Sequence, residues 1–121
     1  MKISIKRAYE DAAAADGYRV LVDRVWPRGR SRQILALGDW TKDIAPSERL
    51  RNWFGHDPAR WATFQDRYRK ELASSDQQAR LHALLAAAGK GPLTLVYGAK
   101  DEEHNQATVL QAILRQMSKR S

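Results

Sequence analysis

The sequence predicts an α/β fold, in which a small, mainly parallel sheet of about three or four strands is flanked by helices. Two stretches, residues 20–22 and 93–99, place apolar side chains on successive positions, as in strands covered on both faces. The segments between and after them space apolar residues three and four apart, which is typical of amphipathic helices. The chain of 121 residues has the length of one ordinary domain, so we expect a single domain over residues 1–121.

Each strand has its own boundary signals. In residues 2–6, isoleucine alternates with lysine and serine, which predicts a strand with one buried face at the edge of the sheet. The dipeptide Asp16-Gly17 is a turn signal ahead of the second strand, and Pro27 ends that strand. Residues 30–46 show no regular pattern, and we expect them to be irregular.

Four helices are predicted from caps and apolar stripes. Ser47 can cap the first helix, and Asp57-Pro58 opens the second. Ser75 begins a capping-box pattern for the third helix, and the fourth starts at about Glu102 and frays over residues 118–121. The stripes predicted to face the core are Leu50/Trp53/Phe54, Trp61/Phe64/Tyr68/Leu72, Leu81/Leu84/Leu85/Ala88 and Leu110/Ile113/Leu114/Met117.

The chain is basic and contains no cysteine. Its 21 Lys and Arg residues against 14 Asp and Glu give a net charge of +7, which attracts nucleic acid, nucleotides and phosphorylated metabolites. The absence of cysteine excludes disulfides, cysteine nucleophiles and thiolate metal sites. No stretch approaches the ~20 apolar residues of a membrane span, and the N-terminus lacks a signal-peptide pattern. We therefore expect a cytoplasmic protein with no membrane partner.

The positive charge is concentrated after the second strand, where four arginines follow Asp23 before the next acidic residue. In open parallel sheets, ligands bind beyond the carboxyl ends of the strands. If the two central strands are parallel neighbours, the polar segments after them share one rim of the sheet. The ligand-binding candidates on this rim are Arg24, Arg28, Lys100 and Asn105.

These positions also have structural interpretations. Arg24 or Arg28 either binds a phosphate or carboxylate through its planar guanidinium or pairs with a nearby aspartate. Lys42 and Ser47 are further ligand-binding candidates, because N–H groups at a helix start attract anions, but a simple cap is the commoner role of such a serine. Trp26 is expected to pack its loop onto the core, whereas Arg30 and Arg32 are interpreted as solvated loop charges.

His104 is the candidate for proton transfer, because imidazole titrates near neutral pH and Asp101 and Asn105 stand close to it in the sequence. Asp101 is the second catalytic candidate, as the residue that orients the ring. The alternative is that His104 is a surface residue in the first turn of the last helix. There is no P-loop, dinucleotide fingerprint, nucleophile elbow or zinc-protease motif, so no cofactor and no metal are predicted.

Four ordered segments resemble a known family. They are RVLVDRVWPRG, DWTKDIAPSERLRNWFGHDP, FQDRYRKEL and LTLVYGAKDEEHNQATVLQAIL. With these segments at matching spacing from about Ile5 to Leu114, the chain resembles the YeaO-like branch of the domain of unknown function 488 (DUF488) family. The resemblance implies a small, single-domain α/β protein without an established activity. Some related sequences carry cysteines, and a thiol mechanism could not operate in this chain.

Three functions follow from these observations. The favoured one is a sensor or enzyme for a small anionic ligand, which predicts a pocket where Arg28, Lys100 and His104 converge. The alternatives are a nucleic-acid-binding module, which lacks a recognition motif here, and an interaction domain whose arginines dock an acidic partner.

Overall fold

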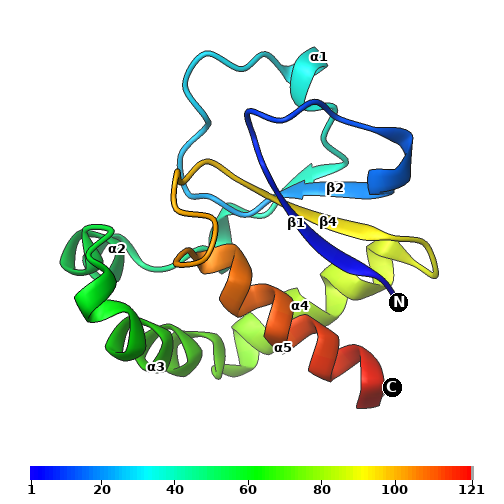
Figure 1. The fold of residues 1–121 in the computed structure, drawn as a ribbon. Helices are drawn as coiled ribbons and strands as arrows, with labels where there is room; N and C mark the ends of the chain where they lie inside the picture. The colour runs from blue at the N-terminus through cyan, green and yellow to red at the C-terminus, as the bar shows by residue number, and fades with distance from the viewer. Residues whose placement is uncertain (121) are drawn as a thin grey trace.

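The computed structural model describes residues 1–120 and contains one four-stranded sheet (Figure 1). The strands are β1 (Ile3–Arg7), β2 (Tyr18–Leu21), β3 (Asp39–Trp40) and β4 (Leu93–Tyr97). They lie in the order β1-β4-β2-β3, and every neighbouring pair is parallel. The predicted α/β fold with a small parallel sheet is therefore confirmed, and β4, the last strand in the chain, occupies an inner position.

Four of the five α-helices of residues 1–120 lie on one side of the sheet. The helices are α1 (Arg32–Leu35), α2 (Glu48–Phe54), α3 (Trp61–Leu72), α4 (Ser75–Ala88) and α5 (Gln106–Arg120). In Figure 1, α2 to α5 lie on one side, with α4 and α5 beneath the strands and α2 and α3 beyond their carboxyl ends. Helix α1 lies on the other side with the long loop that carries it. No helix within residues 1–120 is both long and apolar enough to cross a membrane.

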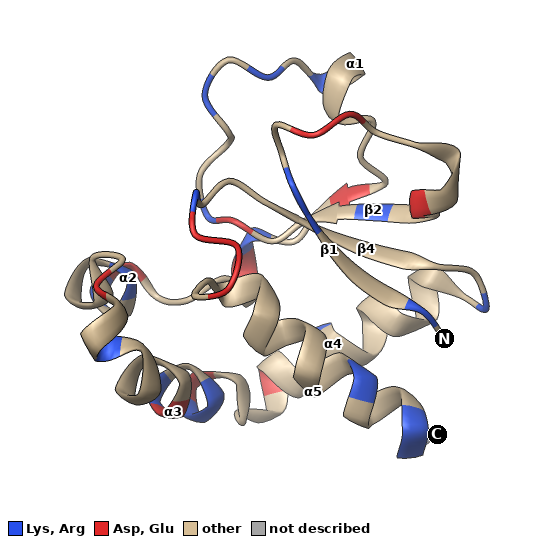
Figure 2. Ribbon diagram, viewed as in Figure 1, with Lys and Arg blue, Asp and Glu red and all other residues tan. Residues whose placement is uncertain are grey.

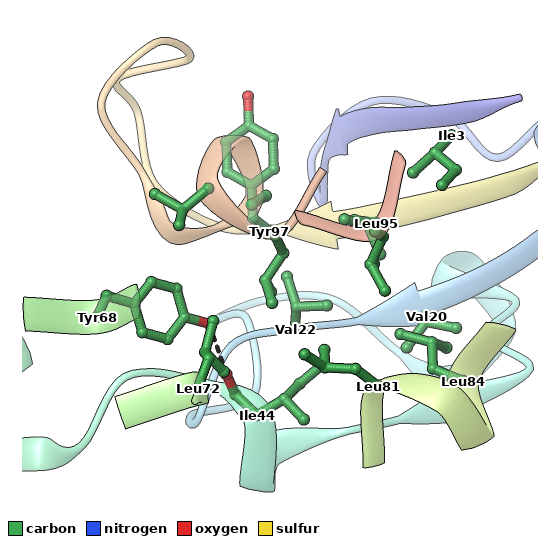
Figure 3. Packing of buried hydrophobic residues seen from close by; sticks show 14 of the residues in the cluster. Ile3, Val20, Val22, Ile44, Tyr68, Leu72, Leu81, Leu84, Leu95 and Tyr97 are labelled. Atoms are coloured by element: carbon green, nitrogen blue, oxygen red, sulfur yellow. Dashed lines mark hydrogen bonds between the residues drawn. The ribbon is translucent and has the colours of Figure 1, made fainter. Parts of the chain in front are cut away.

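Side chains along each strand point alternately to the two faces of the sheet, so the core is divided into two clusters. On the helix-covered face, Leu95 and Tyr97 of β4 pack in the large cluster with residues of α2 to α5 (Figure 3). On the opposite face, Leu21 and Val96 pack with Leu35 of α1 in a small cluster. Successive residues of β4 point to opposite faces, so both faces must be covered, and all five residues of the strand are buried.

A buried hydrogen bond fixes α3 beneath the carboxyl ends of the strands. The Tyr68 hydroxyl donates to the carbonyl oxygen of Ile44 at 2.5 Å, as Figure 3 shows. Ile44 ends a short 3₁₀ turn, Lys42–Ile44, that leads into α2. Burial raises the pKa of Tyr68 well above its usual value, so the hydroxyl stays protonated and keeps donating. This bond therefore holds the α2–α3 segment close to the ends of β2 and β4.

The expectation of an irregular segment over residues 30–46 is wrong in part. The segment contains α1, which Ser31 caps by accepting a hydrogen bond from the Ile34 N–H at 3.1 Å. It also contains β3, whose two residues pair with Val20 and Leu21 of β2. Elements of four and two residues are too short to leave a periodic pattern of apolar residues, so no local signal predicts them.

Three helix ends differ from their predictions. Ser74, not Ser75, caps α4, because its hydroxyl accepts from the Gln77 N–H at 3.2 Å. The last helix begins at Gln106 rather than at about Glu102, because a turn around Asp101 precedes it. The predicted fraying is wrong for residues 118–120, where α5 continues to Arg120, and Ser121 lies outside the described residues.

Candidate functional site

The carboxyl ends of β2 and β4 lie side by side. The two strands are parallel neighbours, with Leu21 opposite Val96, and the Val22 N–H continues the ladder by donating to the Val96 carbonyl at 3.0 Å. The polar segments that follow the two strands therefore begin at one rim of the sheet, as the sequence predicted. This rim is where ligands bind in open parallel sheets.

A cavity of about 240 Å³ opens at this rim and is called the strand-end cavity below. The ends of β2 and β4, the α2–α3 segment and the start of α5 enclose it. Its lining residues are Asp23, Arg24, Val25, Ala45, Pro46, Arg51, Phe54, His56, Phe64, Gly98, Ala99, Asn105 and Gln106. Apolar side chains and a few convergent polar groups are the usual composition of a small-molecule site.

Asp23 is the half-buried acid of the strand-end cavity. Its Oδ2 accepts a hydrogen bond from the Gly98 N–H at 2.8 Å, and its Oδ1 accepts one from the side-chain amide of Gln106. Burial raises the pKa of Asp23 to about 6, although both hydrogen bonds and the charge of Arg51 act to lower it. A Cβ atom on residue 98 would lie 3.0 Å from Oδ2, so glycine at this position lets the carboxylate approach the backbone after β4.

Two arginines line the cavity with Asp23. Arg24 donates from Nε to the Pro46 carbonyl and from Nη2 to the Ala45 carbonyl, each at 3.2 Å. These bonds hold the guanidinium in place, and its Nη1 has no hydrogen-bond partner among residues 1–120. Arg51 is exposed on α2 and has no ion-pair partner in that range. With one acid against two arginines, the lining is positive when Asp23 is ionised and more positive when it is protonated.

Asn105 also lines the cavity, but its side chain is committed to the fold. Its Oδ1 accepts from the N–H groups of Ala107 at 2.9 Å and Thr108 at 3.2 Å, which caps α5. Its Nδ2 donates to the Asp101 carbonyl at 2.9 Å. The side chain is buried, and this cap explains why α5 begins at Gln106.

The other basic candidates are not in the lining of the strand-end cavity. Arg28 and Lys100 have exposed side chains. The Arg28 carbonyl accepts from the Tyr9 hydroxyl at 3.0 Å, which fixes the backbone of the loop rather than the guanidinium. The ammonium of Lys42 lies 5.1 Å from the ring centre of Trp40. Of the predicted ligand-binding residues, Arg24 and Asn105 are the two that reach this cavity.

Ser47 has the structural role that the sequence left open. Its hydroxyl oxygen accepts from the Leu50 N–H at 3.1 Å, which caps α2. The same hydroxyl donates to Glu71 at 2.6 Å, and the Ser47 N–H donates to the other carboxylate oxygen at 2.9 Å. An anion at this helix start would therefore have to displace the carboxylate of Glu71.

His104 and Asp101 form a pair on the turn before α5. The His104 Nδ1 lies 2.8 Å from Oδ2 of Asp101, while Oδ1 accepts from the His104 and Glu103 N–H groups at 3.0 Å. The His104 N–H bond, with the other two, lowers the pKa of Asp101. The imidazole packs edge-on against Trp61, with ring centres 5.2 Å apart. Neither His104 nor Asp101 lines the strand-end cavity, so their proton-transfer role stays a prediction.

The loop after β2 is more ordered than the sequence indicated. Arg30 donates from Nε to the Ala8 carbonyl at 2.9 Å and is half-buried, so its interpretation as a solvated charge is wrong. Trp26 packs against the small core cluster, as expected, with its ring 5.4 Å from that of Trp40. The Trp26 indole N–H donates to the Arg30 carbonyl at 2.7 Å, which closes the loop on itself.

Sequence reasoning missed three polar residues of the cavity, namely Arg51, His56 and Gln106. Gln106 directly follows the candidate segment that ends at Asn105, so extending that segment by one residue would have included it. Arg51 and His56 arrive through the packing of α2 against α3, which no local pattern indicates. His56 has a φ of 56°, which turns the chain after α2.

A second groove lies between α2 and α3 and has a volume of about 450 Å³. It is called the α2–α3 groove below, and its lining residues are Ser47, Arg49, Leu50, Trp53, Arg67, Lys70 and Glu71. The guanidinium of Arg67 lies 4.3 Å from the ring centre of Trp53. No carboxylate within residues 1–120 forms an ion pair with Arg49, Arg67 or Lys70. Figure 2 shows basic residues along both helices.

Residues 1–120 contain no group of three or more His, Cys, Asp or Glu side chains that could hold a metal ion.

Sequence similarity places the chain among known proteins. The family model described as "Inactive DUF488-N3 subclade" matches residues 2–121. The chain belongs to the DUF488 family. This membership confirms the YeaO-like resemblance that the four ordered segments indicated.

Curated DUF488 relatives cover nearly the whole chain. The uncharacterised protein YeaO of Escherichia coli (strain K12) is 45% identical over 117 residues, which is 97% of this chain and 100% of YeaO. The uncharacterised protein Rv3073c of Mycobacterium tuberculosis (strain ATCC 25618 / H37Rv) is 39% identical over 113 residues, 93% of each chain. The uncharacterised protein Mb3100c of Mycobacterium bovis has the same identity and coverage. No solved structure matches the chain.

Proposed function

We propose that this DUF488 protein binds a small anionic ligand, bearing a phosphate or a carboxylate, in the strand-end cavity. The observation that carries the proposal is the placement of Arg24 and Arg51 over one cavity at the carboxyl ends of β2 and β4. A guanidinium offers several N–H donors in one plane and recognises planar or tetrahedral oxyanions through paired hydrogen bonds.

The fixed position of Arg24 supports the proposal. Its bonds to the Ala45 and Pro46 carbonyls already restrict the side chain, so binding a ligand costs little additional rotamer entropy. Arg51 is exposed and supplies a second guanidinium from α2. One arginine held in place by the fold and one that faces solvent suit a ligand that enters from solvent.

The proposed role is binding rather than catalysis. The matching subclade is described as inactive, and the His104–Asp101 pair lies outside the cavity lining. The lining offers no hydroxyl, thiol or amine nucleophile, because it contains no serine, threonine, tyrosine, cysteine or lysine. The expectation of acid–base catalysis by His104 therefore has no support from the cavity and is not part of the proposal.

A thermal-shift screen tests the proposal. Inorganic phosphate, nucleotides, sugar phosphates and small carboxylates are added to the protein at low and moderate salt, since a ligand that binds the native state raises its unfolding midpoint. Arg51→Gln should remove the shift, whereas Arg49→Gln, two residues away on the same helix but outside this cavity, should retain it. A shift that survives Arg51→Gln, or no shift with any anion, contradicts the proposal.

A second function, nucleic-acid binding, is favoured by the α2–α3 groove. Arg49, Arg67 and Lys70 present positive charge without an ion-pair partner in residues 1–120, beside the indole of Trp53. Binding there should weaken steeply with salt, because phosphate contacts release counterions. The same two variants separate the functions: Arg49→Gln should weaken oligonucleotide binding and leave the small-anion shift, and Arg51→Gln should do the reverse.

A further inference from the structure

The size of the strand-end cavity limits its ligand. Its volume of about 240 Å³ is below the roughly 300–1,000 Å³ of cavities that enclose drug-sized ligands. A whole nucleotide, with a base, a sugar and a phosphate, would extend far outside such a cavity. A ligand with one ring and one charged group is small enough to be enclosed.

The walls of the cavity are mainly apolar. Phe54 and Phe64 stack with their ring centres 4.4 Å apart and their planes at 26°, and both side chains are buried. Val25 also lines the cavity and is 56% exposed, one of the few large apolar side chains of the described chain that face solvent. Phosphorylated sugars need polar partners around the whole molecule, whereas these walls complement a planar apolar ring.

The charges of the lining favour a single negative charge. Arg24 already donates two N–H groups to backbone carbonyls, whereas the Arg51 side chain makes no hydrogen bond within residues 1–120, so all of its donors are open to a ligand. Asp23 lies in the same cavity and repels an anion whenever it is ionised. A monoanion balances the one excess positive charge of two arginines against one aspartate. A phosphate dianion would exceed that charge and would lie against the Asp23 carboxylate.

We propose that the ligand of the strand-end cavity is a compact aromatic monocarboxylate, with its carboxylate on Arg51 and its ring against Phe54, Phe64 and Val25. This inference rests on the proposed function and narrows it from any small anion to one chemical class.

Binding of a carboxylate in this position should be accompanied by proton uptake at Asp23. An anion bound beside Asp23 favours the protonated form of that carboxyl, whose pKa burial has already raised to about 6. The affinity should therefore fall as the pH rises through and above this value. The charged or titratable groups that line the cavity or interact electrostatically with Asp23 are Arg24, Arg51, His56 and Tyr68. His56 also lines the cavity, so the Asp23→Asn variant is needed to assign the pH dependence to Asp23.

The test compares benzoate with three probes that each lack one feature. Benzyl alcohol lacks the charge, acetate lacks the ring, and phenyl phosphate carries a dianion in place of the monoanion. Each is titrated by calorimetry against the wild-type protein, Arg51→Gln, and Val25→Asp, which places a negative charge at an exposed position of the lining. Ile34→Asp is the matched control, because Ile34 is 49% exposed and lies on α1, outside the lining.

Benzoate should bind at least tenfold more tightly than each probe, and both Arg51→Gln and Val25→Asp should weaken it tenfold or more. Ile34→Asp should change the affinity less than twofold. Between pH 5.5 and pH 8 benzoate should lose several-fold in affinity, and Asp23→Asn should remove most of that loss.

Three results would overturn the inference in distinguishable ways. Binding of phosphate or phenyl phosphate that depends on Arg51, without binding of benzoate, rejects the aromatic monocarboxylate and leaves the proposed function standing. Failure of every anion to bind rejects both. Equal affinity for benzyl alcohol also rejects the inference, because the carboxylate would then not be recognised.

Discussion

The carboxylate of Asp23 accepts a hydrogen bond from the backbone N–H of Gly98 at 2.8 Å, and this bond joins the ends of β2 and β4. The two residues are far apart in the sequence and meet because β4 pairs with β2. Asp23 thereby becomes a half-buried acid at the rim of the sheet, in the cavity lined by the two guanidinium groups that we propose as the anion site.

The first prediction concerns the pH dependence of stability. The pKa of Asp23 is about 6 in the folded protein, against an ordinary value of 3.8. The folded state holds this proton more tightly than the unfolded state, so the contribution of Asp23 to stability is fully present below pH 3.8 and is lost as the pH rises through about 6. The loss amounts to at most about 3 kcal/mol, because each tenfold difference in proton affinity is worth about 1.4 kcal/mol.

Urea unfolding of wild type and Asp23→Asn between pH 4 and pH 7 measures this effect. Asparagine carries no charge, so the variant should gain stability relative to wild type as the pH rises. Other titrating groups are common to both proteins and cancel in the difference. A difference curve that is flat over this range contradicts the burial assigned to Asp23.

The second prediction compares two serine caps. Ser74→Ala removes only the cap of α4 and should cost about 1 kcal/mol. Ser47→Ala removes the cap of α2 and also one partner of the half-buried Glu71, so it should cost about 2–3 kcal/mol. Chemical denaturation gives both values. Equal losses would mean that the Ser47–Glu71 contact does not stabilise the α2–α3 segment.

The third prediction compares two glycines with nearly the same backbone. Gly17 and Gly89 have φ values of 67° and 65°. A Cβ on Gly17 would lie 2.2 Å from the Pro92 carbonyl oxygen, whereas a Cβ on Gly89 would meet nothing within 4 Å. Gly89→Ala should therefore cost about 1–2 kcal/mol from the positive φ alone, and Gly17→Ala should cost at least ~3 kcal/mol. Thermal midpoints that fall by the same amount would contradict the close approach of residue 17 to Pro92.

The fourth prediction is that His104→Gln changes the affinity for the anion by less than about twofold. Loss of a hydrogen bond to a charged ligand would cost about 1.5–3 kcal/mol of binding free energy, which is a much larger change in affinity. His104 pairs with Asp101 and packs on Trp61, outside the lining of the strand-end cavity. Calorimetric titration of the ligand found in the screen measures this. A tenfold loss of affinity, with the unfolding midpoint of the free protein unchanged, would place His104 in the site and revive its proton-transfer role.

The sequence predicted the strands that bury consecutive apolar residues and the helices with long apolar stripes, because burial imposes those patterns locally. It did not predict β3, whose two residues depend on pairing with β2. The candidate site was likewise predicted only where a local pattern located its residues. Arg24 follows its strand directly, so the rule about strand ends located it, whereas Arg51 reaches the cavity only because α2 packs on α3. Arg28 and Lys100 also follow their strands, but no local pattern tells whether a loop side chain turns toward a cavity or toward solvent.

Nuclear magnetic resonance of the 15N-labelled protein tests the central proposal most directly. The backbone amide of Gly98 and the side-chain amide of Gln106 both bond to Asp23 in the strand-end cavity, while the Trp53 indole N–H reports on the α2–α3 groove. The protein is titrated with benzoate and, separately, with inorganic phosphate. At least one of these two ligands should shift the signals of both Gly98 and Gln106 in a saturable way. The signal of the Trp53 indole should not move. Saturable movement of the Trp53 indole with Gly98 and Gln106 unchanged, or no saturable shift at all, would contradict an anion site at the ends of β2 and β4.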